Sequence, residues 1–240
     1  MGNEGGTWIM HGRSWDDPRR IRSWQELTDR VNEVGFLPLF SNRIPGFSVE
    51  EQVSDAFWWT GDREQDPWEW REIIARSGEI AYGKFFGNRA GFISKAWLPL
   101  FANYRRSGYD FDARWEDGLA KYREKKIMDC FDSSAELESP RLKQLAGFGK
   151  DGEKNFDGIL AELQMQTYLV VTDFRRKRNK YGCPYGMPVC VYTRPETLWG
   201  EALVTDAYHE PPEESRQRIF AHVRSLYPDA AEKSLICELK

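Results

Sequence analysis

The sequence contains few of the residues that build metal centres. It has three histidines and four cysteines, and no two cysteines are separated by two residues. A structural zinc site needs about four clustered thiolate or imidazole ligands, so we expect no metal and no cofactor. The cysteines are expected to be buried, unreactive thiols, because a Cys183–Cys190 bridge would fit poorly with a reducing compartment.

Long hydrophobic runs are also missing. No apolar stretch approaches the roughly 20 residues that span a bilayer, so we expect no membrane partner. The glycine-rich start, residues 1–7, has no charged-then-apolar signal pattern, which favours a cytoplasmic location. Hydrophobic residues make up 40% and charged residues 30%, values typical of a globular protein.

The charge is unevenly distributed. The net charge of −4 argues against a nucleic-acid partner. Residues 139–195, however, contain ten Lys and Arg against five Asp and Glu, whereas the remainder has 24 against 33. Basic residues gathered in one region are the electrostatic footprint of a protein that contacts a polyanion.

Local signals predict a mainly α-helical fold with small β-hairpins, in the α+β class. Ser23 and Glu26 form a capping box, and Asp66-Pro67 starts another helix. Gly87-Asn88 predicts the turn of a hairpin near 79–95. Further helices are expected from Ser48 and over residues 113–131. We expect a flexible arm (1–22), a helical, Trp-rich region (23–138), a winged helix (139–195) and a helical tail (196–240).

Residues 139–195 have the element order of a winged helix-turn-helix: two short helices, then a hairpin with strands at 168–174 and 187–193. A protruding basic tip suits phosphate contacts, so a double-stranded DNA partner is predicted. The alternative is that these charges only keep an exposed hairpin tip soluble and contact no DNA. Asp157 and Glu162 on the second helix disfavour sequence-specific reading. The predicted DNA-binding residues are Lys154, Asn155, Arg175, Arg176, Lys177, Arg178 and Lys180.

Aromatic residues are dense in the amino-terminal half. Trp58, Trp59, Trp68 and Trp70 are expected to lie mainly in the core, although they could stack bases or line a pocket. The candidate pocket for a small molecule consists of Trp68, Trp70, Arg71, Tyr82 and Lys84. Glu69 or Glu72 is the candidate for a catalytic carboxylate, and Gln164 and Gln166 are expected to be structural.

Several segments resemble a known family. Residues 34–42 (VGFLPLFSN), Ser139-Pro140-Arg141-Leu142, the helix in 155–169 and a hairpin ending in Val191-Tyr192 resemble the AlkZ/YcaQ winged-helix DNA glycosylases. The likeness covers about residues 27–195 and is nearest to a shorter, AlkZ-related group. It implies a winged helix, a DNA partner and repair of alkylated or crosslinked DNA.

The resemblance does not supply catalytic residues. The family's Gln-x-Gln or Gln-x-Asp motif falls on Pro38 and Phe40, and neither side chain can orient a water molecule. The catalytic residues therefore stay unknown, and if the protein is an enzyme it is a DNA glycosylase. The alternative is a ligand-sensing or protein-interaction module, similar to a transcriptional regulator, without glycosylase activity.

Overall fold

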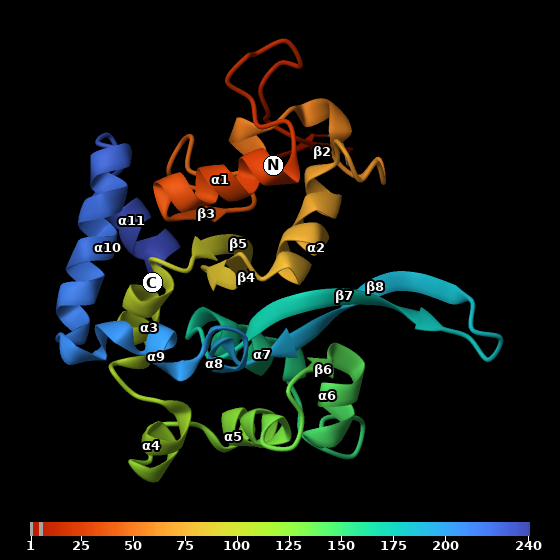
Figure 1. Cartoon of the computed structure of the whole chain (residues 1–240), viewed down its shortest axis with the longest axis vertical. Coiled ribbons are helices and arrows are strands. Elements are labelled where there is room, and N and C mark those ends of the chain that lie inside the picture. Colours follow the sequence, from red (N-terminus) through yellow and green to blue (C-terminus); the bar gives the residue numbers. More distant parts are fainter. Residues whose placement is uncertain (1, 5–6) are drawn as a thin grey trace.

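The computed structural model describes residues 2–4 and 7–240. Its centre is a six-stranded antiparallel sheet in the order β3-β5-β4-β7-β8-β6, with helices packed around it (Figure 1). A separate pair, β1 with β2, lies near the amino terminus. The strands are β1 Gly2–Glu4, β2 Thr7–Ile9, β3 Phe36–Pro38, β4 Ile80–Phe86, β5 Arg89–Ser94, β6 Leu137–Glu138, β7 Val170–Arg178 and β8 Pro184–Thr193.

Most helices are short. Those of the first half are α1 Trp24–Val34, η1 Glu50–Gln52, η2 Asp55–Phe57, α2 Pro67–Ser77, α3 Leu98–Arg106 and α4 Phe111–Glu116. Those of the second half are α5 Tyr122–Met128, η3 Asp129–Phe131, α6 Ser139–Leu145, α7 Phe156–Met165, α8 Pro195–Trp199, α9 Glu201–Val204, η4 Asp206–His209, α10 Pro212–Leu226 and α11 Glu232–Leu239. None of the helices among the described residues is long and apolar enough to cross a membrane.

The helix caps follow the sequence signals. The Ser23 hydroxyl accepts a hydrogen bond from the Glu26 amide at 3.2 Å, and the Asp66 carboxylate accepts one from the Trp68 amide at 2.8 Å. Gly35 ends α1 with φ of 85°, and a Cβ there would lie 2.5 Å from the Trp97 ring. These contacts confirm the predicted starts of α1 and α2.

Two predicted helices are wrong. Residues 113–131 do not form one long helix, because Gly118 adopts φ of 70° and separates α4 from α5. The helix expected from Ser48 is only the short 3₁₀ turn η1. There the Ser48 hydroxyl accepts from the Glu51 amide and donates to the Glu51 carboxylate, which favours a tight local turn over a longer helix.

The sheet joins the two halves of the chain. Tyr82 of β4 pairs with Val171 of β7, so the predicted hairpin near 79–95, confirmed as β4 and β5, continues into the strands of residues 139–195. The segment expected to be a flexible arm also packs on the body. Met10 and Ile21 are buried, and the Ile21 amide donates to Gln52 O at 2.8 Å.

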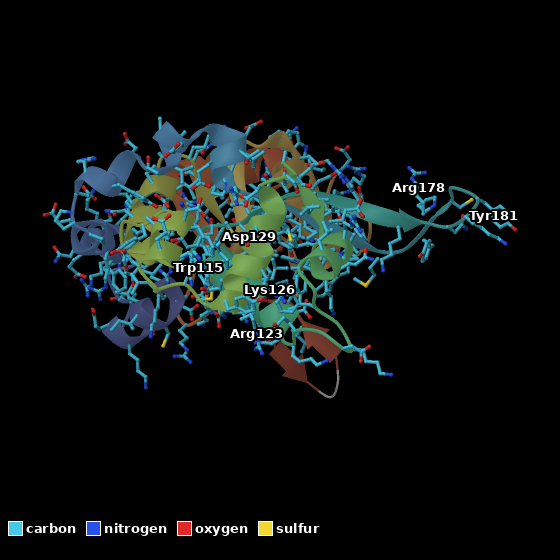
Figure 2. The ribbon with its side chains drawn as sticks, turned by 90° about the horizontal axis from the view of Figure 1, so that it is seen from below. Trp115, Arg123, Lys126, Asp129, Arg178 and Tyr181 are labelled. Carbon is cyan, nitrogen blue, oxygen red and sulfur yellow. The ribbon has the colours of Figure 1, made fainter. Side chains whose placement is uncertain are left out.

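The β7–β8 hairpin is longer than its predicted strands. β7 extends to Arg178 and β8 begins at Pro184, so most of the predicted tip belongs to paired strands. Lys177 lies opposite Tyr185, and the register shifts between Arg175 and Lys177. Both views show the outer part of this ribbon projecting well beyond the body (Figures 1 and 2).

Helix α7 is covered by the protein. Its buried residues include Phe156, Ile159, Leu160 and Leu163, which form the predicted apolar stripe, and also Ala161 and Gln164. It packs against β4 and α5. A helix that reads bases must present a free face to the major groove. Residues 139–195 contain two helices followed by a hairpin, in the predicted order, but α7, the helix expected to read bases, is largely covered by packing. The winged helix itself stays a prediction.

Candidate nucleic-acid interface

The outer half of the β7–β8 hairpin presents four unpaired cations. Arg176, Lys177, Arg178 and Lys180 are exposed. Within residues 2–4 and 7–240, no carboxylate forms an ion pair with any of them. Arg178 donates to Gly182 O at 2.9 Å, and the Lys180 ammonium lies 4.9 Å from the Tyr181 ring centroid. Their full charges therefore face solvent.

The fifth predicted cation of the hairpin is different. Arg175 lies at the base of the hairpin and donates to Glu136 at 2.5 Å and to Asp173 at 2.8 Å. These hydrogen bonds raise the pKa of Arg175, with Glu136 contributing most. Arg175 therefore orders the hairpin base, although its pair with Glu136 is exposed and contributes little to stability.

A cationic groove of about 540 Å³ runs from the hairpin base into its outer half. Five of its lining side chains are cations and two are carboxylates: Arg76, Arg175, Arg176, Lys177 and Arg178 against Glu138 and Asp173, with Phe174 and Pro184 completing the wall. Arg76 comes from α2 and was not among the predicted site residues. It donates to Asp173 at 2.5 Å and to Phe174 O at 2.7 Å, which ties α2 to β7.

Asp173 is the charged centre of the groove base. Burial raises its pKa, but hydrogen bonds from the Arg76 side chain, the Phe174 amide and the Arg175 side chain outweigh burial and leave the pKa below its ordinary value. Asp173 is therefore ionised at neutral pH and neutralises part of the positive charge around it.

Lys154 and Asn155 are used inside their own loop. The Lys154 ammonium donates to Gly149 O at 2.7 Å and to Lys150 O. Asn155 adopts φ of 67° at the start of α7, where its side chain makes no capping hydrogen bond. Both residues are exposed, yet neither lines the groove. Their role in DNA binding stays a prediction.

Several side chains of the candidate pocket pack on one another or on their neighbours, and a small-molecule site there stays a prediction. The Arg71 guanidinium lies 3.6 Å from the Trp68 ring centroid and 4.4 Å from that of Phe174. Tyr82 is buried against Phe174. Trp70 is also buried, and its indole nitrogen donates to Glu64 O. Lys84 is exposed. The structure thus brings together Trp68, Arg71 and Tyr82, but as packing.

The Trp cluster divides between core and surface. Trp58 and Trp70 are buried, as expected for core residues, while Trp59 is 46% exposed. Of the two candidate carboxylates, Glu69 is half-buried and Glu72 is buried. Burial raises the pKa of Glu72 against the opposing effect of Arg71. Glu72 also lies 3.8 Å from Arg76, which places it behind the groove.

The positions that correspond to the family's Gln motif are apolar and packed. Pro38 lies in β3, and Phe40 contacts Trp58 and Trp68 with ring centroids 5.5 and 6.2 Å apart. Elsewhere, Gln164 accepts from the Lys84 amide at 3.1 Å and donates to Leu160 O at 3.1 Å. Gln164 therefore joins β4 to α7, which is the structural role expected of it.

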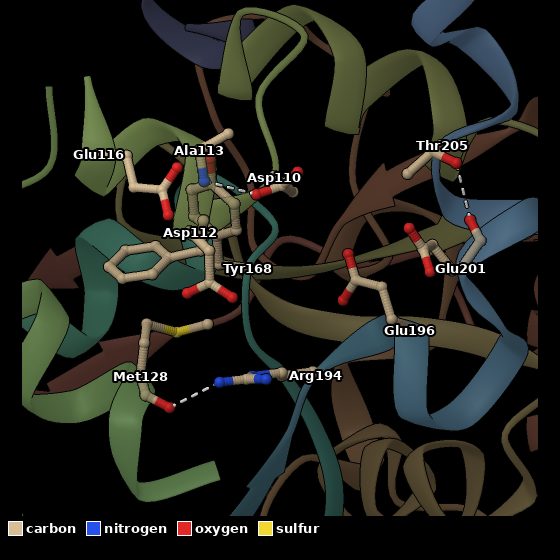
Figure 3. Close-up of a pocket in the computed structure, with 11 residues that line it drawn as sticks. Asp110, Asp112, Ala113, Glu116, Met128, Tyr168, Arg194, Glu196, Glu201 and Thr205 are labelled. Atoms are coloured by element: carbon tan, nitrogen blue, oxygen red, sulfur yellow. Dashed lines mark hydrogen bonds between the residues drawn. The ribbon is translucent and has the colours of Figure 1, made fainter. Parts of the chain in front are cut away.

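A second cavity has the opposite charge. It has a volume of about 500 Å³ and is lined by Asp110, Asp112, Glu116, Glu196 and Glu201, with Arg194, Phe111, Ala113, Met128, Tyr168 and Thr205. The carboxylates of Asp112, Glu196 and Glu201 face a common space (Figure 3). The cavity could not be predicted from the sequence. The acidic run from Asp110 to Glu116 is visible there, but the other two carboxylates come from α8 and α9, which are distant in the chain.

Behind the acidic cavity lies a buried cation. Arg106 is 1% exposed and donates to Glu196 at 2.5 Å and to Thr167 O at 2.6 Å. Burial lowers the pKa of Arg106, but its interactions with Glu196, Tyr208 and Tyr168 together outweigh burial and leave the pKa above its ordinary value. One of the five carboxylates is thereby neutralised from within.

The cysteines lie closer to the surface than expected. Cys183 at the hairpin tip is exposed, and Cys130, Cys190 and Cys237 are only partly buried, so the expectation that the four thiols are buried is wrong. All four are free. Burial raises the pKa of Cys190. Among the described residues, no group of three or more His, Cys, Asp or Glu side chains is placed to hold a metal ion.

Comparison with known proteins gives one match. A family model described as AlkZ related matches residues 21–239, nearly the whole chain. No curated protein and no solved structure matches the chain. The match extends beyond both ends of the segment, about 27–195, over which the sequence motifs resemble that group.

Proposed function

Because the chain belongs to the AlkZ-related family, we propose that it binds double-stranded DNA through the β7–β8 hairpin and the cationic groove at its base. Family membership connects the protein with DNA repair at a coarse level. The observation that carries the proposal is a set of four exposed cations on a projecting ribbon, none of which forms an ion pair with a residue that the structure describes (Figure 2).

The contacts are made with phosphates and not with base edges. The hairpin supplies long cationic side chains, and each phosphate that they neutralise releases condensed counterions. Helix α7 has little free surface, and it carries Asp157 and Glu162. Binding is therefore independent of sequence and strongly dependent on salt.

A salt titration tests the proposal. The full chain is compared with a variant in which Arg176, Lys177, Arg178 and Lys180 are all replaced by Ala, by fluorescence anisotropy with a labelled intact duplex. Each lost phosphate contact reduces the slope of log K against log salt by about 0.9. We expect the slope to fall by up to about 3.6 and affinity at low salt to drop by at least about 100-fold.

The matched control removes four cations from α10 and α11, which lie on the other side of the body from the hairpin tip (Figure 1). Its substitutions are Arg216→Ala, Arg218→Ala, Arg224→Ala and Lys233→Ala. This control has the same net charge as the hairpin variant, but we expect its slope of log K against log salt to be that of the wild type. If both variants lose the same affinity, or neither does, the hairpin is not the DNA-binding surface.

A further inference from the structure

The hairpin tip carries exposed apolar side chains among its cations. Tyr181 and Met187, each 78% exposed, are the two most exposed large apolar side chains among the described residues, and Tyr185 on the same hairpin is 52% exposed. Leaving such area in water is unfavourable. Three of them on one projecting ribbon indicate a contact surface.

The tip holds Tyr181 in a hydrogen-bonded loop. The Asn179 side chain accepts from the Tyr181 amide at 2.9 Å and from the Cys183 amide at 3.0 Å. The Asn179 amide donates to Cys183 O at 3.0 Å, and the Gly182 amide donates to Asn179 O at 2.9 Å. The ring is therefore presented from a defined backbone, which lowers the entropy lost on contact.

Cations flank the aromatic rings closely. Lys180 lies against the Tyr181 ring, Arg178 donates to the loop at Gly182, and Lys177 is paired across the ribbon with Tyr185. Alternating aromatic rings and cations match the chemistry of a nucleic-acid strand, because base faces stack on aromatic rings while phosphates attract the cations.

We propose that Tyr181 stacks on a nucleobase that is unpaired or partly unstacked, so that the protein prefers DNA with an interrupted base stack over intact duplex. This inference rests on the proposed function and names the substrate class of the same site. In intact duplex the base faces are covered by their neighbours, and only an interruption exposes a face to a ring held on the hairpin.

The experiment measures preference as well as affinity. Wild type, Tyr181→Ala and Tyr181→Phe are titrated with an intact duplex and with the same duplex carrying a short single-stranded gap that contains 2-aminopurine. Tyr122→Ala is the matched control, because Tyr122 is 61% exposed on α5, outside the hairpin. Circular dichroism of each variant checks that the fold is retained.

We expect Tyr181→Ala to lose about tenfold in affinity for gapped DNA and less than about twofold for the duplex, and to lose the quenching of 2-aminopurine. Tyr181→Phe and Tyr122→Ala retain both. Equal losses on both DNAs, or unchanged quenching, would overturn the stacking proposal while leaving duplex binding by the cations intact. The same variants are also tested for binding to anionic lipid vesicles. If Tyr181→Ala loses vesicle binding while its preference for gapped DNA is unchanged, the ring contacts lipid and the stacking proposal is also overturned.

Discussion

The cationic groove and the acidic cavity are nearly equal in volume, about 540 and 500 Å³, and opposite in charge. The groove contains five cations and two carboxylates, whereas the cavity contains five carboxylates and one arginine. A protein with a net charge of −4 can therefore attract a polyanion at one place and repel it at another.

The two regions also differ in what neutralises them. In the groove, one carboxylate, Asp173, accepts hydrogen bonds from both Arg76 and Arg175. At the cavity, one buried cation, Arg106, pairs with Glu196. Asp173 and Arg106 are thus internal counter-charges of the two regions, beside Glu138 in the groove and Arg194 in the cavity. Removing each counter-charge tests how far the comparison holds.

The largest effect is expected from Arg106→Met. Removing one partner of a buried pair costs about 3–5 kcal/mol, because Thr167 O loses a donor and Glu196 is left without its partner. Chemical denaturation measures the free energy of unfolding. Arg218→Met, which breaks the more exposed pair with Glu210, should cost no more than about 1 kcal/mol. Equal costs would mean that Arg106 has no special role behind the cavity.

A smaller effect is expected from Asp173→Asn. Because the pKa of Asp173 is lowered in the folded protein, its ionised form stabilises the fold at pH values above the ordinary carboxyl pKa of about 3.9. This contribution disappears as the pH falls through the lower pKa of the folded state. The variant should be less stable by roughly 1–3 kcal/mol at pH 7 and similar to wild type in acid. Thermal unfolding across pH measures this difference.

The same variant should bind DNA more tightly. Loss of the carboxylate removes a negative charge from beside Arg76 and Arg175, so phosphate is attracted more strongly to the groove and the salt slope should steepen by up to about 0.9 for each new contact. Glu213→Gln on α10 is the control, since its pair with Arg216 lies outside the groove. Tighter binding by both variants would point to net charge alone as the cause.

The smallest effect is expected from neutralising the acidic cavity. Asp112→Asn, Glu116→Gln and Glu201→Gln together should raise DNA affinity by no more than about twofold at low salt and not at all at physiological salt, since screening acts within about 8 Å. Fluorescence anisotropy measures this change. A gain as large as that of Asp173→Asn would show that the cavity borders the DNA.

Local features of the fold could be predicted from the sequence. Ser23, Asp66-Pro67 and Gly87-Asn88 define caps and a turn through contacts within a few residues. The break at Gly118 was missed because the charged residues on either side of it have helical propensity, and a single glycine in such a run does not always end a helix.

The candidate site could be predicted only in part. The cations of residues 175–180 are contiguous and visible, but Arg76 and Asp173 are 97 residues apart and meet only because α2 packs on β7. The exposure of Tyr181 and Met187 depends on how far the hairpin extends. A one-dimensional pattern does not give that length, because the strands continue through residues with high charge.

The pairing of β4 with β7 has a consequence for motion. The ribbon that would hold DNA is a continuation of strands in the middle of the sheet, so restraint applied at its outer end is transmitted through backbone hydrogen bonds. A ligand held at Tyr181 should therefore slow amide hydrogen exchange in β4, well away from any surface it touches. Slower exchange in β4 would show that binding at the hairpin is felt in the opposite half of the chain.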